Sequence, residues 1–306
     1  MRNTFVSTLI EQAKKNKSIE LITGDLGFGV LKPFWEQCPD QFTNAGIAEQ
    51  NMTALAAGMA LNGKIAFTYS IGNFSTLRCL EQIRNDCAYH NANVKIVCVG
   101  GGFVYGSLGV SHHATEDLSI MRALPNVVVM APGDPVEAKY CCEALIKYNG
   151  PGYLRLGRGG EPAIHSEIKD FAVGKAIKIA NGKKAALFST GAILNEVIAA
   201  RDLLISEGIT PAVYSFPTVK PIDKELIRKC ATEYDLIVTC EENNLSGGFG
   251  SAVSEVLCEI EGAKARLHRV GIKDIYCSVV GNQEYLRKIC NIDKESIAKS
   301  VVEKLL

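Results

Sequence analysis

Residues 46–69, GIAEQNMTALAAGMALNGKIAFTY, place one carboxylate before a run of very small side chains and then a strand-like apolar stretch. The run from Gln50 to Asn62 carries no charge, so it predicts a helix that other elements can approach closely. Glu49 stands at the helix start, where the dipole favours a carboxylate. We expect Glu49 to enter a buried region, and a buried carboxylate needs a partner or a proton. It is either a first-turn residue of a core helix or a group that meets a ligand nitrogen.

Strand-like and helix-like segments alternate along the first half of the chain. The predicted strands are 20–23, 64–69, 94–99, 126–131 and 152–156. Continuous apolar strands covered on both faces are what a parallel sheet requires. The stretch Asp134-Pro135-Val136-Glu137 offers an N-cap, a proline in the first turn and a glutamate three residues after the cap. It predicts a helix over about 135–148.

A second alternating unit follows a stretch without any period. Residues 157–170 are rich in Gly, Pro and charge, which is typical of a linker. Beyond them we predict strands at 185–190, 210–216, 235–240 and 265–270, and helices around 193–207, 223–233 and 247–260. The sequence therefore predicts an α/β fold of two three-layer αβα domains, 1–160 and 175–306, joined by a linker over 161–174.

Composition and charge exclude several classes of protein. Of 306 residues, 47% are apolar, and 33 basic side chains balance 33 acidic ones. The neutral balance argues against a polybasic binder of nucleic acids or membrane surfaces, and no apolar run approaches the ~18 residues of a membrane-spanning helix. The eleven cysteines include no C-x-x-C pair. Because no secretory segment is evident either, we expect free buried thiols, a cytoplasmic location and no metal site on this chain.

The order of several short motifs resembles the transketolase class of thiamine-diphosphate enzymes. GIAEQN (46–51) with its small-residue helix is similar to the pyrimidine-binding module of that class. The match continues through Tyr69-Ser70, Phe74, EQIRND (81–86), Ser111-His112-His113, EDLSIMRALPNVVVMAPGDPVEA (116–138) and GPGYLRLGRG (150–159). The second unit resembles the transketolase C-terminal domain through KPID (220–223), VTCEENN (238–244) and GGFGSAV (247–253). The resemblance covers essentially the whole chain and extends to the C-terminal half of 1-deoxyxylulose-phosphate synthases.

This resemblance implies that the first unit has a mostly parallel sheet and contains a thiamine diphosphate site. Glu49 would hydrogen-bond the ring nitrogen of the aminopyrimidine and stabilise its imino tautomer, which is the cofactor's own chemistry. Tyr69 and Phe74 match the aromatic positions beside that pyrimidine, and ordinary core aromatics are the alternative interpretation. Asp25 matches an acidic position close to the cofactor or to a subunit interface, and it could equally be a turn or cap residue.

The resemblance also implies a substrate pocket. His112 matches the catalytic histidine that contacts donor hydroxyls or moves a proton, and His113 is its neighbour. Arg158 matches an arginine that binds the substrate phosphate, with Arg155 nearby, because an arginine fork suits phosphate. A surface ion pair is the alternative for Arg158.

Two departures from the family pattern fall in this pocket. The family loop G-E-D-G or G-A-D-G places an Asp against a donor hydroxyl, whereas here Gly106-Ser107-Leu108-Gly109 puts Leu108 at that position. Loss of that acceptor should change which donor is accepted, so we expect a non-standard sugar. Gly100-Gly101-Gly102 replaces His or Arg of relatives, and we expect these glycines to leave room for a bulkier acceptor, such as a nucleotide-linked or branched sugar.

Whole transketolases begin with a further domain whose G-D-G…N motif holds the metal and the diphosphate. GDLGFG (24–29) follows a strand but lacks the second glycine in register. The chain is therefore predicted to be the C-terminal subunit of a split transketolase. A separate N-terminal subunit would hold Mg²⁺ and the diphosphate in an α2β2 assembly, and this chain alone would be inactive. The expected reaction moves a two-carbon ketol or acyl unit from a ketose or 2-oxo donor to an aldehyde or ketone acceptor.

Two alternatives remain. One is the β subunit of a 2-oxo-acid dehydrogenase decarboxylase component, which shares GIAEQ and the two-domain plan, although HHATEDLSIMRALPNVVV (112–129) is nearer the transketolase pattern. The other is a non-catalytic transketolase-like paralogue. Leu108 favours that second alternative, whereas the presence of Glu49, His112 and Arg158 opposes it.

Overall fold

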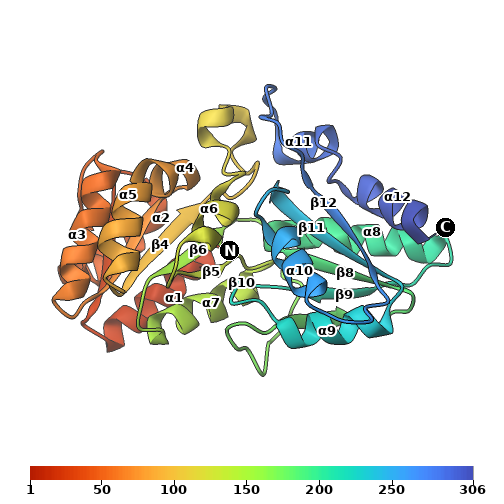
Figure 1. The fold of residues 1–306 in the computed structure, drawn as a ribbon. Helices are drawn as coiled ribbons and strands as arrows, with labels where there is room; N and C mark the ends of the chain where they lie inside the picture. Colours follow the sequence, from red (N-terminus) through yellow and green to blue (C-terminus); the bar gives the residue numbers. More distant parts are fainter. Residues whose placement is uncertain (306) are drawn as a thin grey trace.

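A computed structural model describes residues 1–305 and contains two sheets, each covered by helices on both faces (Figure 1). The first sheet has seven strands in the order β10-β5-β6-β4-β3-β1-β2, and the second has five in the order β12-β11-β8-β9-β7. Neighbouring strands run parallel except for the edge pairs β10 with β5 and β7 with β9. The predicted α/β class with two αβα units is confirmed.

All nine predicted strands are present. In the first unit they are β1 (Ile19–Thr23), β3 (Ile65–Ile71), β4 (Val94–Val99), β5 (Val128–Met130) and β6 (Gly152–Leu156). In the second they are β8 (Ala185–Thr190), β9 (Ala212–Ser215), β11 (Leu236–Asn244) and β12 (Arg266–Ile272). The predicted helices are α3 (Glu49–Leu61), α7 (Pro135–Lys147), α8 (Leu194–Ser206), α9 (Lys224–Glu233) and α10 (Phe249–Cys258).

The layers of the first unit follow from the alternation of side chains along its strands. Phe67 and Tyr69 of β3 pack on one face with α1 (Arg2–Lys15), α2 (Phe28–Gln37) and α7. Ala66 of β3 packs on the other face with α3, the π-helix η3 (Ile83–Tyr89) and α6 (Asp117–Ala123). The start of α7 is as predicted, because the Asp134 carboxylate accepts from the Glu137 amide at 2.7 Å. Glu49 thus lies on the face opposite to Tyr69.

The second unit contributes a strand to the first sheet, which the sequence did not predict. Strand β10 (Thr218–Lys220) pairs antiparallel with β5, and Ala131 N donates to Pro217 O at 2.9 Å. One apolar cluster accordingly runs from α6 through Phe216 to Phe249 of α10. Other elements that the sequence did not predict include β2 (Phe42–Asn44), β7 (Ile177–Ala180), α11 (Gln283–Ile289) and α12 (Lys294–Leu305). Between Leu156 and Ile177 the chain forms no helix or strand; the domain limits at 160 and 175 stay a prediction.

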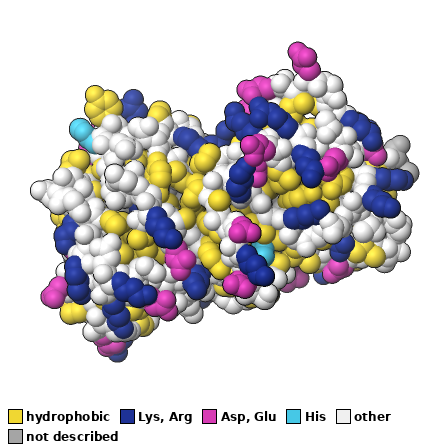
Figure 2. Space-filling model, turned by 90° about the horizontal axis from the view of Figure 1, so that it is seen from below, with side chains coloured by type: hydrophobic (Ala, Val, Ile, Leu, Met, Phe, Trp, Pro, Cys, Tyr) yellow, Lys and Arg dark blue, Asp and Glu magenta, His cyan; other side chains and the backbone are white. Residues whose placement is uncertain are grey.

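The distribution of charged side chains and cysteines agrees with what the sequence predicts. Figure 2 shows basic and acidic side chains interspersed over one face of both units. All eleven cysteines are free, and only Cys258 is exposed. In residues 1–305 no helix has both the length and the apolar character needed to span a bilayer.

Candidate active site

The candidate residues of the first unit follow the carboxyl ends of parallel strands, where α/β folds place their ligands. Gly24 follows β1 and approaches the start of α3 so closely that a Cβ there would lie 3.4 Å from Cγ of Glu49. Glu49 is 4% exposed. Phe74 follows β3 in the short helix α4 (Gly72–Ser75), and His112 lies in the loop after β4.

A line of contacts joins Glu49 to His112 through a residue that the sequence analysis missed. Arg78 Nη1 donates to Glu49 Oε2 at 2.8 Å, and its guanidinium carbon lies 4.5 Å from the centroid of the Phe74 ring. The Phe74 ring meets the His112 imidazole edge-on, with 5.2 Å between centroids. Arg78 could have been found as the only charged residue between Lys64 and Glu81.

The environment of Glu49 fits an aminopyrimidine. One carboxylate oxygen is bonded to Arg78, whereas Oε1 makes no hydrogen bond to any residue from 1 to 305. The ring of Phe74 is only half-buried. A carboxylate oxygen with a free lone pair beside an aromatic ring can hold a ring N–H and its heterocycle.

Contacts to the backbone of its loop, more than contacts of its imidazole ring, fix the position of His112. Asn73 Nδ2, from α4, donates to the carbonyl of His113 at 2.6 Å. The His112 ring is half-exposed, and its Nδ1 lies 3.0 Å from Ser111 Oγ. The pKa of His112 is lowered mainly by partial burial and to a smaller extent by the neighbouring His113. The imidazole is therefore neutral near pH 7 and can accept or donate a proton.

His113 and Leu108 take different positions in the same loop. The His113 ring is buried, lies edge-on to Phe103 with 5.2 Å between centroids, and places Nε2 3.3 Å from Gly106 O. It stabilises the loop from inside, so the predicted substrate contact by this ring is not supported. Leu108 is 54% exposed in the 3₁₀ turn Gly106–Leu108.

Tyr69 does not reach the Glu49 side of the sheet. Its ring is 1% exposed and stacks on Phe5 of α1, with 6.2 Å between centroids. Burial raises the pKa of its hydroxyl. Strand alternation turns residue 69 toward α1, so this geometry favours the alternative interpretation of Tyr69 as a core aromatic.

Arg155 is likewise a core residue and not a phosphate ligand. Its Nε and Nη2 donate to the two oxygens of Asp117 at 2.8 and 3.1 Å, and Nη2 also reaches Glu242 O at 2.9 Å. Arg155 is 5% exposed and Asp117 is 1% exposed. Because these donors are already engaged inside the fold, the geometry does not support the predicted role of Arg155 in substrate binding.

The three glycines before the loop do not leave room for a substrate. A Cβ on Gly100 would lie 2.3 Å from the Tyr105 ring, one on Gly101 would meet Arg155 at 2.5 Å, and one on Gly102 would meet Glu242 at 2.6 Å. The space beside each glycine is filled by side chains of this chain. The expectation of extra room for a bulky acceptor is therefore wrong.

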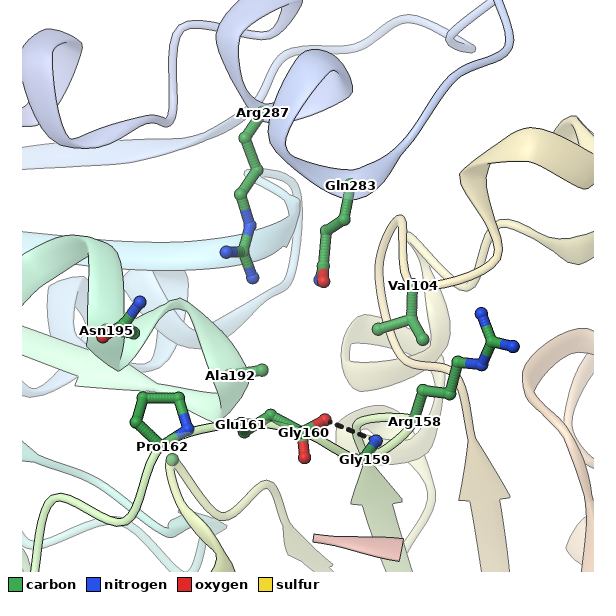
Figure 3. Close-up of a pocket in the computed structure, with 11 residues that line it drawn as sticks. Val104, Arg158, Gly159, Gly160, Glu161, Pro162, Ala192, Asn195, Gln283 and Arg287 are labelled. Atoms are coloured by element: carbon green, nitrogen blue, oxygen red, sulfur yellow. Dashed lines mark hydrogen bonds between the residues drawn. The ribbon is translucent and has the colours of Figure 1, made fainter.

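Arg158 lines a cleft of about 310 Å³ between the two units (Figure 3). Its guanidinium carbon is 6.0 Å from the centroid of Tyr105, and the side chain is exposed. Glu161 lies in the same cleft and pairs with the Met1 ammonium at 2.8 Å. Arg158 is free to bind an anion, and this role stays a prediction. The cleft is lined by Val104, Gly133, Arg158, Gly159, Gly160, Glu161, Pro162, Ala192, Asn195, Gln283 and Arg287.

Asp25 forms part of a turn beside Glu49. It adopts a positive φ of 55°, and its carboxylate accepts from Asn44 Nδ2 at 3.0 Å while its amide donates to Asn44 Oδ1. The reciprocal pair supports the turn interpretation. Because Asp25 directly follows Gly24, a cofactor contact also stays a prediction.

A second cluster lies at the start of α7. His165 Nδ1 is 3.1 Å from Asp134 Oδ2, and His165 Nε2 is 3.7 Å from Glu137 Oε1. These are the residues that best resemble a metal-ligand set in the described part of the chain. However, Asp134 Oδ2 already accepts from the amides of Ile164 and His165, and the imidazole faces one carboxylate with each nitrogen. The geometry suits a shared proton better than a cation.

The comparisons with known proteins agree with the motif order. The family model for the transketolase pyrimidine-binding domain matches residues 1–161, and that for the transketolase C-terminal domain matches residues 174–297. A putative transketolase C-terminal section of Methanocaldococcus jannaschii is 38% identical over all of this chain and 96% of the relative. One of the subunits of the apulose-4-phosphate transketolase of Actinobacillus succinogenes is 34% identical over 97% of this chain and 96% of the relative.

A solved structure described as a split gene transketolase, inactive beta4 tetramer, is similar to the whole chain. It has a TM-score of 0.89 and 32% identity, and the match covers 99% of this chain and 97% of that one. The two relatives of similar length are thus named as a section and a subunit of transketolases. The chain belongs to the transketolase family of transferases.

Proposed function

We propose that this chain is the C-terminal subunit of a two-component transketolase that uses thiamine diphosphate. The reaction moves a two-carbon ketol unit from a ketose or 2-oxo donor to an aldehyde or ketone acceptor. The observation that carries the proposal is the line of contacts from Glu49 through Arg78 and Phe74 to His112. It brings a buried carboxylate, an aromatic ring and a neutral imidazole to one edge of a parallel sheet.

Each side chain of this line has a task that its surroundings support. Glu49 Oε1 binds the ring nitrogen of the aminopyrimidine, Phe74 packs beside that ring, and Arg78 fixes the carboxylate through Oε2. When bound, thiamine diphosphate supplies the electron sink that lets a carbon–carbon bond beside a carbonyl group break and re-form. His112, with its lowered pKa, accepts or donates a proton at the donor hydroxyl. Magnesium and the diphosphate are assigned to the partner subunit.

Exposed apolar side chains beyond the carboxyl ends of the strands support a partner at this edge of the sheet. Five large apolar residues there are 42–80% exposed, and they follow the ends of four strands: Phe28, Ile47, Leu77, Leu108 and Val110. Such a concentration of apolar surface is typical of a protein–protein contact. We assign it to the N-terminal subunit in an α2β2 assembly.

The substrate is proposed to be a non-standard sugar. Leu108 stands where the family pattern has an Asp, and it is exposed at the end of its turn. A site without that acceptor cannot hydrogen-bond the same donor hydroxyl. The relative named for apulose-4-phosphate shows that split members of this family include enzymes for unusual sugars.

The experiment that tests the proposal is reconstitution. We expect the chain with an N-terminal transketolase-type subunit, thiamine diphosphate and Mg²⁺ to transfer a ketol unit from ketose donors to a panel of aldehyde and ketone acceptors. The isolated chain should show no turnover. Turnover by the isolated chain would contradict the split model. Carbon dioxide release from 2-oxo acids with a dye acceptor, without ketol transfer, would favour the 2-oxo-acid dehydrogenase alternative.

A further inference from the structure

A buried carboxylate of the second unit reaches into the loop that carries His112. Glu242 lies on β11 and is 3% exposed. Its Oε1 accepts from the backbone amide of Phe103, in the first unit, at 2.7 Å. Gly102 has a positive φ of 67°, and a Cβ there would lie 2.6 Å from the Glu242 carboxylate. The carboxylate therefore packs directly on the start of the loop.

Residues of α11 hold this carboxylate in place. Arg287 donates to Glu242 Oε2 through Nε at 2.9 Å and Nη2 at 2.5 Å, and Gln283 Nε2 lies 3.0 Å from both oxygens. Arg287 Nη1 also reaches Glu196 of α8 at 3.2 Å. Figure 3 shows Arg287 and Gln283 pointing from α11 into the space between the units, with Val104 of the loop across from them. Both Arg287 donors meet Oε2, so Oε1 remains directed at the Phe103 amide.

Contacts inside the loop connect Phe103 to His112. The Phe103 ring lies edge-on to His113, and His113 Nε2 approaches Gly106 O. Gly106 in turn is packed against Leu286 of α11, which a Cβ at Gly106 would meet at 2.4 Å. His112 is the residue directly before His113. Figure 1 shows this loop, drawn in yellow, standing beside α11.

We propose that Glu242, clamped by Arg287, is a positioning residue that holds the loop 103–113 in the shape that presents Leu108 and His112 to the substrate. The second unit then acts on the reaction without touching the reacting atoms. The kinetic consequence of this proposal rests on the proposed function. The claim that Glu242 holds the loop rests on the contacts alone. It explains why a unit with no residue in the Glu49 line carries a buried ion pair at the junction.

The test compares Glu242→Ala and Glu242→Gln with the matched control Glu255→Gln. Glu255 also forms an ion pair across the junction, with Arg122 at 2.6 Å, but it does not contact the loop. In the isolated chain we expect hydrogen–deuterium exchange of the Phe103 amide and of residues 103–113 to rise at least ~10-fold in Glu242→Ala. Glu242→Gln, whose amide oxygen can still accept from Phe103, should show a smaller rise, and the control none. Unchanged exchange in a folded Glu242→Ala chain would overturn the proposal.

The kinetic arm uses the reconstituted complex. We expect kcat/KM for the donor to fall ~10- to 100-fold in Glu242→Ala, a size ordinary for a lost positioning contact, with partial rescue in Glu242→Gln. The apparent affinity for thiamine diphosphate should change less than kcat/KM for the donor, because Arg78, which lies outside the loop, holds the Glu49 carboxylate. A raised exchange rate with unchanged donor kinetics would overturn the positioning role. An inactive wild-type complex would contradict the proposed function instead, and the exchange arm would still decide whether Glu242 holds the loop.

Discussion

Two carboxylate–arginine pairs of the first unit differ in what they leave unsatisfied. In the pair Asp117–Arg155 both side chains are buried, and the guanidinium is bonded to both carboxylate oxygens and to two backbone carbonyls. In the pair Glu49–Arg78 the arginine side chain is 48% exposed and one carboxylate oxygen has no partner among residues 1–305. The first arrangement, called the complete pair because both carboxylate oxygens are bonded, stabilises the fold. The second, called the incomplete pair, leaves one oxygen of a buried carboxylate available for a ligand.

Breaking the complete pair should have the largest effect. We expect Asp117→Ala to lower the free energy of unfolding by about 3–5 kcal/mol, because it leaves the Arg155 charge buried and unpaired. Urea unfolding of the isolated chain measures this loss. The matched control is Glu255→Ala, whose exposed pair with Arg122 should contribute about 1 kcal/mol or less. Equal losses in the two variants would show that the Asp117 pair is not special.

Breaking the incomplete pair should affect activity much more than stability. We expect Glu49→Ala to lower turnover of the reconstituted complex at least ~10²-fold, because the variant loses the proton contact to the pyrimidine. The control is Glu20→Ala, since Glu20 forms a 2.8 Å pair with Lys64 and has the same kind of burial at the other end of the sheet. Glu20→Ala should leave turnover unchanged. An unaltered rate in Glu49→Ala would favour a non-catalytic role for the chain.

The difference between these pairs explains how far the sequence could predict the site. The strand containing Arg155 was predicted, but an apolar strand covered on both faces does not show which neighbours an inward arginine meets. Arg78 lies in the 3₁₀ helix η2 (Leu77–Cys79), which is too short to show a period, and only its isolation as a charged residue marks it in the sequence. Phe74 and Glu49 were found through motif order, and the structure brings them together.

The fold shows the same division between local and tertiary information. Helix α7 follows from its own cap residues, Asp134 and Pro135. Strand β10 could not be predicted, because its three residues gain their pairing from β5, a strand of the other unit. The glycines at 100–102 were expected to be open space, and their neighbours Tyr105, Arg155 and Glu242 come from three separate parts of the chain.

Substitution of Leu108, on the solvent-exposed part of the site, should have a smaller effect. We expect Leu108→Asp to improve kcat/KM for a phosphorylated ketose about 10-fold, because the new carboxylate can accept from a donor hydroxyl. Val110→Asp is the matched control, since Leu108 and Val110 are both 54% exposed in the same loop. Initial rates with several ketose phosphates measure the change. If both variants behave alike, added charge rather than position explains the result.

A third carboxylate, Glu137, faces a histidine instead of an arginine. We expect its substitution to have the smallest effect of those considered. Glu137 and His165 are held near each other at the junction, and both Glu137 Oε1 and His165 Nε2 lack a hydrogen-bond partner among the described residues. Burial raises the pKa of Glu137 to about 7, and the carboxylates Asp134 and Glu137 raise the pKa of His165 against the opposing effect of burial. Ser215 also lies close to Glu137 and carries no charge. The folded chain therefore holds protons that the unfolded chain releases.

The sign of the pH dependence follows from this difference. Because both folded-state pKa values are raised, the stabilisation is complete at pH values below those of the unfolded groups and is lost as pH rises through the folded values. Between pH 5 and 8 the free energy of unfolding should therefore fall as pH rises. Glu137→Gln should flatten this slope, since an amide keeps the acceptor for Gly133 N without a titrating proton. The exposed His90→Asn is the control and should keep the wild-type slope. A wild-type slope in Glu137→Gln would mean that Glu137 and His165 do not share a proton.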